Sequence, residues 1–309
     1  MQNASRIYHA LVEFAGQSNQ WADLRHLHVL AGMVVGLLSE GSVNLTSWIY
    51  SVESKARYAQ STQGRFQRWL HNPRINVARL YSPLIQATLA GWQDEVLYLS
   101  LDTSCLWNQY CIIRISVVYR GRAVPVGWRV IAHNSSSVAL STYQDLLRRV
   151  AGLMPGEASV VLLADRGFVG RQLCRYVSRY VRDRLNWHYR IRIKGKFWFW
   201  CPGKGWRQIQ TFHLNRGEAW LLQHVSVHKT DSLADVHLAL GYEATSGEYW
   251  YILSSEPTTL QTFREYGKRF DLEENFLHDK SHGFDLETSL IRSATALSRS
   301  WSWRWRLSI

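Results

Sequence analysis

Three acidic residues occupy positions from which they could bind the same metal ions. Asp102 ends the apolar segment VLYLSLD and Asp165 ends SVVLLAD, so each is predicted to close a buried strand. Glu273 lies in YGKRFDLEENFLHDK, residues 266–280. Three carboxylates without histidine or cysteine ligands favour Mg²⁺ or Mn²⁺, and two such ions about 3.5–4 Å apart can activate the attacking oxygen and stabilise the leaving oxygen at a phosphodiester. A single aspartate at a strand end more often caps the following turn, so the interpretation depends on the three acids acting together.

Residues 266–280 also carry groups that bind anions. At about 100° per helical residue, Tyr266, Arg269, Glu273 and Lys280 point within roughly 60° of one another. Arginine and lysine suit phosphate oxygens, and tyrosine can donate to a phosphate or stack on a base. This face is therefore predicted to hold a phosphodiester beside a carboxylate that binds metal. The alternative is an ordinary solvated helix, which usually interleaves its charges.

The overall charge of the chain agrees with an anionic partner. Among 309 residues, 36 are Lys or Arg and 24 are Asp or Glu, which gives a formal net charge of +12. Nucleic acid is the leading partner for such a charge, and a basic protein without an anionic partner is the alternative. No secretory signal stands at the N-terminus, and Val29–Leu38 is too short to span a bilayer. We therefore expect a cytoplasmic protein without membrane contact.

Mixed strands and helices are predicted to position the acids, so the fold class is α/β. The periodicity of residues 93–185 predicts, besides the strands that end at the two aspartates, a strand pair at 110–131 and helices at 142–154 and about 170–182. Residues 186–261 alternate polar and apolar side chains between Gly, Asn and Asp turns, which predicts a β-rich insertion. One long helix is expected over Thr258–Phe284.

Residues 1–92 show apolar side chains at helical spacing and predict a small helical domain. Within it, Ser54–Trp69 carries Arg57, Arg65 and Arg68 among aromatic residues. Preceded by Leu45–Tyr50 as a first helix, this segment could be the recognition helix of a helix-turn-helix. A solvated basic helix that packs on the core fits the pattern equally well.

The spacing Y-x2-R-x3-E-x6-K of residues 266–280, together with the two aspartates after apolar strands, resembles the DDE transposases of bacterial insertion sequences, in the family usually numbered four. The resemblance implies that Asp102, Asp165 and Glu273 are the catalytic residues and bind two Mg²⁺ or Mn²⁺ ions. It also implies an RNase H-like mixed sheet, interrupted by a β-rich insertion between the second Asp and the Glu.

The resemblance assigns domains to the chain. Residues 1–92 would form a helical DNA-binding domain, residues 93–185 and 262–309 an RNase H-like catalytic core, and residues 186–261 the insertion. The similarity is good over about residues 93–290 and only general before that.

In that family the signature Tyr, Arg and Lys contact the backbone of the transposon end, which here implies Tyr266, Arg269 and Lys280. A tryptophan of the insertion assists base flipping in some members. The candidates for base stacking here are Trp198, Trp200 and Trp206. Packing in the core is the commoner role for a tryptophan in a segment that forms a sheet.

The expected activity is metal-dependent cleavage at transposon ends followed by joining of the 3′-OH to target DNA. The implied partner is double-stranded DNA, bound by a homodimer in the bacterial cytoplasm at the nucleoid. Only 29 residues follow Lys280, whereas family members continue with further helix, so a C-terminal truncation is expected. Two alternatives stay open: a nuclease on the same RNase H-like scaffold, and an inactive, truncated DNA-binding relic that represses transposition.

Overall fold

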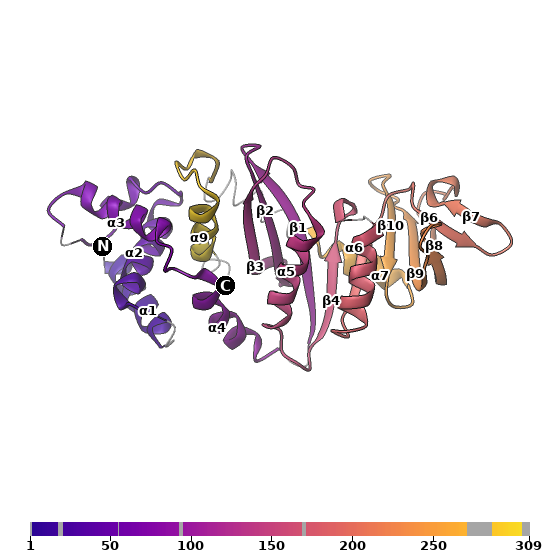
Figure 1. The fold of residues 1–309 in the computed structure, drawn as a ribbon, viewed down its shortest axis with the longest axis horizontal. Helices are drawn as coiled ribbons and strands as arrows, with labels where there is room; N and C mark the ends of the chain where they lie inside the picture. Colours follow the sequence, from indigo (N-terminus) through magenta and orange to yellow (C-terminus); the bar gives the residue numbers. More distant parts are fainter. Residues whose placement is uncertain are drawn as a thin grey trace.

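A mixed ten-stranded sheet runs along the molecule and carries helices at one end and on its faces (Figure 1). The computed structural model describes residues 2–17, 21–54, 56–92, 95–168, 171–270 and 286–304. The strand order is β3-β2-β1-β4-β5-β10-β9-β8-β6-β7. The prediction of an α/β fold is therefore confirmed.

The first half of the sheet combines an antiparallel meander with two parallel strands. Its strands are β1 (Val96–Leu106), β2 (Tyr110–Tyr119), β3 (Arg122–Ala132), β4 (Ser159–Ala164) and β5 (His188–Arg192). β1 pairs antiparallel with β2 and parallel with β4, and β4 pairs parallel with β5. The predicted strand pair at 110–131 is confirmed. Arg120 and Gly121 turn the chain between its strands, both with positive φ, as a tight hairpin requires.

The second half of the sheet is antiparallel. Its strands are β6 (Trp198–Cys201), β7 (Gly205–Gln208), β8 (Ala219–Val227), β9 (Leu233–Tyr242) and β10 (Tyr249–Ser254). β10 pairs with β5, so the segment predicted as an insertion continues the same sheet instead of forming a separate one. β5 also falls inside the predicted range 186–261, although it pairs in parallel with β4.

Helices cover the sheet and connect its strands. They include α5 (Leu140–Ala151), which packs on β2 and β3, and α6 (Arg171–Tyr176), which continues as a π-helical segment over Val177–Arg182. Gly127 on β3 allows the close approach of α5, because a Cβ there would lie 2.5 Å from Val150 Cγ2. The two helices predicted at 142–154 and about 170–182 are present with shifted ends.

The N-terminal segment is helical and lies at one end of the molecule (Figure 1). It contains α1 (Gln2–Gly16), α2 (Leu24–Glu40), the 3₁₀ turn η1 (Ser47–Tyr50), α3 (Ala59–His71) and α4 (Val77–Leu89). Trp48 and Phe66 are buried here and pack edge to face, with ring centroids 6.0 Å apart. The prediction of a first helix over Leu45–Tyr50 is wrong, because only four residues form a 3₁₀ turn there.

The predicted long helix over Thr258–Phe284 is also wrong as one continuous element. α7 (Leu260–Gly267) ends at Gly267, and Lys268 and Arg269 form a turn. The backbone N–H groups of these two residues bond to the carbonyls of Glu265 and Tyr266, three residues back, which tightens the chain. Gly267 favours a helix end, because glycine has a low helix propensity.

The C-terminal helix α9 (Ala294–Arg304) lies between the N-terminal helices and β3 (Figure 1). The indole of Trp128 on β3 donates to the carbonyl of Ser298 at 2.8 Å. On the other side, the buried guanidinium of Arg299 donates to the carbonyls of Leu70 at 2.7 Å and Ile75 at 3.3 Å. α9 therefore joins the helical end to the sheet. Within the described residues, no helix is both long and apolar enough to cross a membrane.

Replacing Arg299 by Met is expected to lower the free energy of unfolding by about 2 kcal/mol, because it leaves two carbonyls at a buried contact without these donors. Urea denaturation would measure the loss. Arg74→Met, at an exposed position near the same contact, is the matched control and should change stability by less than about 0.5 kcal/mol. Equal stability of the two variants would show that Arg299 does not hold α9 to the helical end.

Candidate active site

The two aspartates lie side by side because of the parallel pairing of β1 and β4. The last register pair of these strands is Leu101 with Ala164, so Asp102 and Asp165 are the next residue on each chain. Neighbouring strands are about 4.8 Å apart, which brings the two side chains to one edge of the sheet. Asp165 follows the end of β4, as predicted.

Asp102 does not end its strand, contrary to the prediction. β1 continues to Leu106, and these additional residues pair only with β2, as in Ser104 with Ile112. Asp102 thus stands where β1 loses its neighbour β4 but keeps β2. Asp102 therefore lies inside a strand, where its Oδ1 accepts a hydrogen bond from the backbone N–H of Thr103 at 2.8 Å.

Tyr266 and Arg269 connect the two carboxylates through hydrogen bonds. The Tyr266 hydroxyl donates to Asp165 Oδ1 at 3.2 Å and accepts from Arg269 Nε at 3.0 Å. Arg269 Nη1 donates to Asp102 Oδ2 at 3.3 Å. Both side chains are buried, Tyr266 at 0% and Arg269 at 2% relative exposure. A continuous chain of polar contacts therefore runs from one aspartate to the other.

Aromatic rings surround this chain of contacts. The Trp250 ring meets Tyr266 edge to face at 5.6 Å, and the Phe270 ring lies 5.3 Å from the Arg269 guanidinium carbon. Burial raises the pKa of Tyr266, so its hydroxyl stays protonated at physiological pH and remains a donor to Asp165. The contact between tyrosine and aspartate is therefore expected to be insensitive to pH in the neutral range.

A second arginine stands beside Asp102. Arg114 on β2 is the register partner of Asp102 and is 1% exposed. Side chains of directly opposed residues in an antiparallel pair lie on one face, with Cβ atoms about 4.5–5.5 Å apart. Asp102 thus has a cation on each side, Arg114 from the sheet and Arg269 from the end of α7. The sequence contains a sign of this role, because Arg114 is the single arginine within the apolar run CIIRISVV. The sequence does not indicate that Asp102 is its neighbour.

An ion network fixes α7 against the sheet. Arg190 on β5 donates to Glu265 Oε2 at 2.9 Å and to Glu256 Oε2 at 2.6 Å, and its side chain is nearly buried. The Thr259 side chain caps the start of α7 by accepting from the backbone N–H of Gln261. These contacts hold the helix end that carries Tyr266 at the carboxyl end of β4.

The other residues of the predicted signature cannot be placed. Glu273 and Lys280 lie outside the described residues. Tyr266 and Arg269 were predicted to contact a DNA backbone, and the structure places their polar atoms on the two aspartates. Sequence reasoning missed these contacts, although the i, i+3 spacing of Tyr266 and Arg269 indicated that the two side chains are neighbours.

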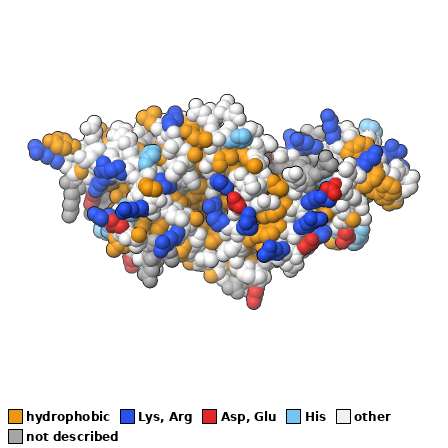
Figure 2. Space-filling model, in the orientation of Figure 1, with side chains coloured by type: hydrophobic (Ala, Val, Ile, Leu, Met, Phe, Trp, Pro, Cys, Tyr) orange, Lys and Arg blue, Asp and Glu red, His pale blue; other side chains and the backbone are white. Residues whose placement is uncertain are grey.

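The basic residues predicted to bind DNA through the N-terminal segment are exposed. Arg65 and Arg68 lie on α3, and Arg57 precedes that helix. Arg65 Nη2 donates to Ser54 Oγ at 2.9 Å. Lys and Arg side chains also occur along the rest of the face seen in Figure 2, over the central sheet as well as the helical end.

The three predicted stacking tryptophans lie on the β6–β7 hairpin. Trp198 is 36% and Trp200 is 46% exposed, so core packing is not the role of either. Trp206 meets Trp200 edge to face at 5.8 Å, and the Lys229 ammonium lies 5.5 Å from the Trp198 ring centroid. The hairpin thus presents aromatic rings and a cation together.

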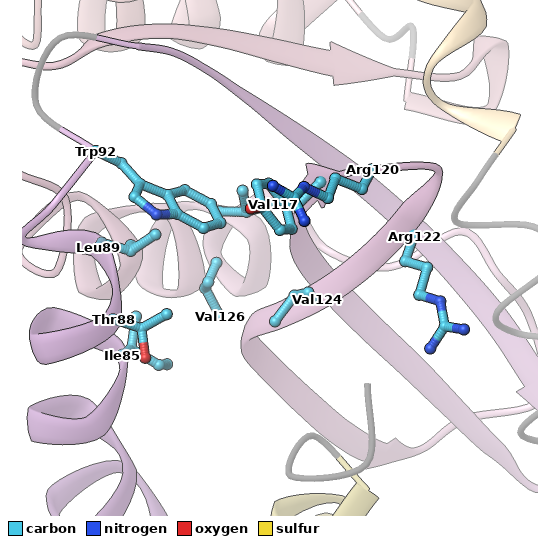
Figure 3. A pocket seen from close by; sticks show the side chains of 10 residues that line it. Ile85, Thr88, Leu89, Trp92, Val117, Arg120, Arg122, Val124 and Val126 are labelled. Atoms are coloured by element: carbon cyan, nitrogen blue, oxygen red, sulfur yellow. The ribbon is translucent and has the colours of Figure 1, made fainter. Parts of the chain in front are cut away.

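A cavity of about 280 Å³ lies away from the aspartates, between α4 and the β2–β3 hairpin (Figure 3). Its wall is mainly apolar, and the Trp92 and Tyr119 rings stack there at 4.4 Å. Neither aspartate lines it. Chemistry at the carboxylates would thus take place at the sheet edge and not in this cavity.

The donor set at the sheet edge fits a hard cation. Asp102 and Asp165 offer carboxylate oxygens, and the Asp102 side chain is 16% exposed. The two carboxylates could hold Mg²⁺ or Mn²⁺, with Glu273 as a predicted third ligand. The Arg269 guanidinium opposes a cation at this edge, so metal binding would compete with its contact to Asp102.

The chain matches no family model and no curated protein.

Proposed function

We propose that this protein is a DNA transposase of the DDE type. The observation that carries the proposal is the placement of Asp102 and Asp165 next to each other on parallel strands, with Tyr266 and Arg269 of the signature bonded to them. Ionisable side chains gathered around partly buried carboxylates at one end of a sheet are a candidate functional site. The arrangement supports a site for phosphodiester chemistry.

The sheet supports an RNase H-like core in this proposal. Three antiparallel strands are followed by a helix, a strand parallel to β1, a further helix and another parallel strand, with the aspartates at β1 and at the end of β4. The antiparallel strands β6–β10 come between Asp165 and the signature, as an insertion in the DDE family would.

In this proposal Asp102, Asp165 and Glu273 hold two Mg²⁺ or Mn²⁺ ions. When bound, the ions supply activation of the attacking oxygen and stabilisation of the leaving oxygen. Tyr266 orients Asp165 by its hydrogen bond, and Arg269 orients Asp102. A phosphate that reaches the carboxylates also lies next to the Arg269 guanidinium, so this residue could contact the DNA backbone without leaving the site.

Two phosphoryl transfers follow. In the first, water attacks a phosphodiester at the transposon end, a P–O bond forms, and the P–O3′ bond breaks to free the 3′-OH. In the second, that 3′-OH attacks a phosphodiester of target DNA and displaces one target strand end. The number of phosphodiester bonds is unchanged in the second step, so it needs no external energy source.

Double-stranded DNA would be bound by several parts of the chain. Arg57, Arg65 and Arg68 would neutralise backbone phosphates, and Lys280 would contact the backbone of the transposon end. Trp198, Trp200 and Trp206 would stack on an extruded base, which the exposure of Trp198 and Trp200 on the β6–β7 hairpin supports. A homodimer would hold the paired transposon ends.

Strand transfer is the experiment that tests this function. Inverted repeats that flank the gene would supply the DNA ends, and the purified chain with Mg²⁺ should join their 3′-OH to a plasmid. Cleavage without joining would instead indicate a nuclease on the same scaffold. Binding of the ends without cleavage would indicate a DNA-binding repressor. The absence of both cleavage and joining would contradict the proposed transposase function.

Replacement of Arg65 and Arg68 by Glu is expected to weaken binding of the ends, because each lost phosphate contact reduces counterion release. The slope of log K against log salt should become shallower by about 0.9 per contact. Fluorescence anisotropy over a salt series measures this slope. The double replacement of Arg120 and Arg122 by Glu, at the β2–β3 hairpin, makes the same change of net charge and is the control, which should have a smaller effect. Equal slopes in the two variants would assign α3 some other role.

A further inference from the structure

A second group of side chains that can bind metal lies on β8 and β9 and includes neither Asp102 nor Asp165. His224, Asp235 and His237 each offer one ligand atom, and these atoms all lie within 4.8 Å of one another. His224 Nδ1 is 2.7 Å from Asp235 Oδ1, and the two imidazole rings have centroids 4.9 Å apart. Three ligands from two neighbouring strands thus converge at one point.

A β-bulge creates this convergence. Leu222 pairs with Leu238 and Val225 with Val236, so two residues of β8 face His237 alone. A bulge bends a strand and redirects a side chain, and bulges are frequent near functional sites. His224 and Asp235 also have positive φ, 50° and 56°, which costs a non-glycine residue roughly 1 kcal/mol or more. The backbone therefore holds two of the three ligands in unfavourable conformations.

The ring of His237 is positioned by a backbone contact. Its Nδ1 accepts a hydrogen bond from the backbone N–H of His224 at 3.2 Å, so the proton of the neutral ring is on Nε2, and a metal ion bound at Nδ1 would replace this hydrogen bond. His237 is 4% exposed and fixed in place, whereas the side chains of His224 and Asp235 are each 72% exposed and can adjust.

We propose that His224, Asp235 and His237 form a binding site for a divalent transition-metal ion of the zinc type, with solvent as the fourth ligand. Two imidazoles and one carboxylate match the ligands of Zn²⁺, whereas Mg²⁺ prefers oxygen ligands alone. Bonds of about 2.0–2.1 Å in a tetrahedron separate ligand atoms by about 3.3 Å. The contact between His224 and Asp235 would then open by about half an ångström, and a pair of ligand atoms at the 4.8 Å limit would close by about 1.5 Å.

A metal ion at this site would fasten β8 to β9 at the bulge. The carbonyl of Asp235 also accepts a hydrogen bond from Arg182 Nη1 at 3.2 Å, at the end of the π-helical segment. This contact ties the site to the element that leads from Asp165 to β5. The charges of Arg182 and Arg190 oppose a nearby cation and reduce its affinity. The ion would bind apart from the proposed Mg²⁺ site and would cross-link β8 to β9.

Zinc titration of the purified full chain by calorimetry, in excess Mg²⁺, tests the proposal. One Zn²⁺ ion should bind per chain, and Co²⁺ at the same site should give the visible absorption of a tetrahedral complex. His224→Ala and Asp235→Asn should each weaken binding at least about tenfold, because each removes a direct ligand. Both side chains are exposed, so these variants are expected to fold.

His213→Ala is the matched control, an exposed histidine in the segment between β7 and β8, and should bind zinc as the parent does. Asp102→Asn should also leave zinc binding unchanged, which separates this site from the proposed catalytic one. Zinc binding that Asp102→Asn abolishes, or that survives both His224→Ala and Asp235→Asn, would overturn the proposal. The absence of zinc binding would also overturn the proposal. None of these results would bear on whether the protein cleaves and joins DNA.

Discussion

Replacement of Asp102 by Asn is expected to lower the rate of DNA cleavage by at least about 10³-fold, because it removes a proposed ligand of the catalytic metal ions. Asp102 lies beside Asp165 across the β1–β4 pair, and the proposed site needs both carboxylates as ligands. Binding of the transposon ends should change little, since the asparagine contacts no additional phosphate. Cleavage in Mg²⁺ and end binding would be measured on the same preparation.

Asp145→Asn is the matched control for this substitution. Asp145 lies on α5, is 56% exposed and pairs with Arg148 at the surface, so its replacement removes one negative charge without touching the sheet edge. Cleavage by this variant should equal that of the parent protein. A cleavage rate of Asp102→Asn near that of the control would show that the sheet edge is not the active site, whatever the fold resembles.

The strands that carry the aspartates could be predicted because their apolar runs are distinctive. Both VLYLSL and SVVLLA are buried strands, and the residue after each is an aspartate. The end of β1 could not be predicted in the same way. Thr103–Leu106 begins with two polar residues and pairs with β2 alone, so the extension depends on a partner strand further along the chain. Strand ends follow from pairing as well as from composition.

Pairing between distant segments also explains why β5 was assigned to the insertion. Its residues alternate like those of β8 and β9, and nothing local indicates that it lies parallel to β4. β10, more than fifty residues later in the chain, occupies its other edge and connects the two halves of the sheet. The predicted start of the insertion at residue 186 therefore marks a change in sequence pattern. It does not mark a break in the sheet, which continues through β5 and β10.

The signature could be predicted only as a set of residue types. An uninterrupted helix would place Tyr266 and Arg269 on a face open to DNA, but the turn after Gly267 lets the Arg269 side chain fold back onto the Tyr266 hydroxyl. Long-range contacts with Asp165 and Asp102 then bury both residues. Helical spacing describes which side chains share a face, and tertiary packing decides what that face contacts.

Arg269→Met is expected to lower the free energy of unfolding by roughly 2–4 kcal/mol in the absence of DNA and metal, because it separates Asp102 from a buried partner. The expected loss of unfolding free energy is smaller than that for breaking a fully buried ion pair, because the Asp102 side chain is 16% exposed. In the Asp102→Asn background the same substitution should cost roughly 1–3 kcal/mol less. Urea denaturation of the four proteins in this double-mutant cycle gives the coupling directly.

The same substitution tests whether Arg269 also contacts phosphate in the DNA complex. A phosphate at the carboxylates lies within reach of the guanidinium, so the salt slope of end binding should become shallower by about one unit. Arg264→Met, exposed on α7, is the matched control for both measurements and should change stability by less than about 0.5 kcal/mol. A large destabilisation with an unchanged slope would confine Arg269 to positioning Asp102. If Arg269→Met left the stability unchanged and showed no coupling energy with Asp102→Asn, the contact between Arg269 and Asp102 would be contradicted. The proposed active site depends on that contact.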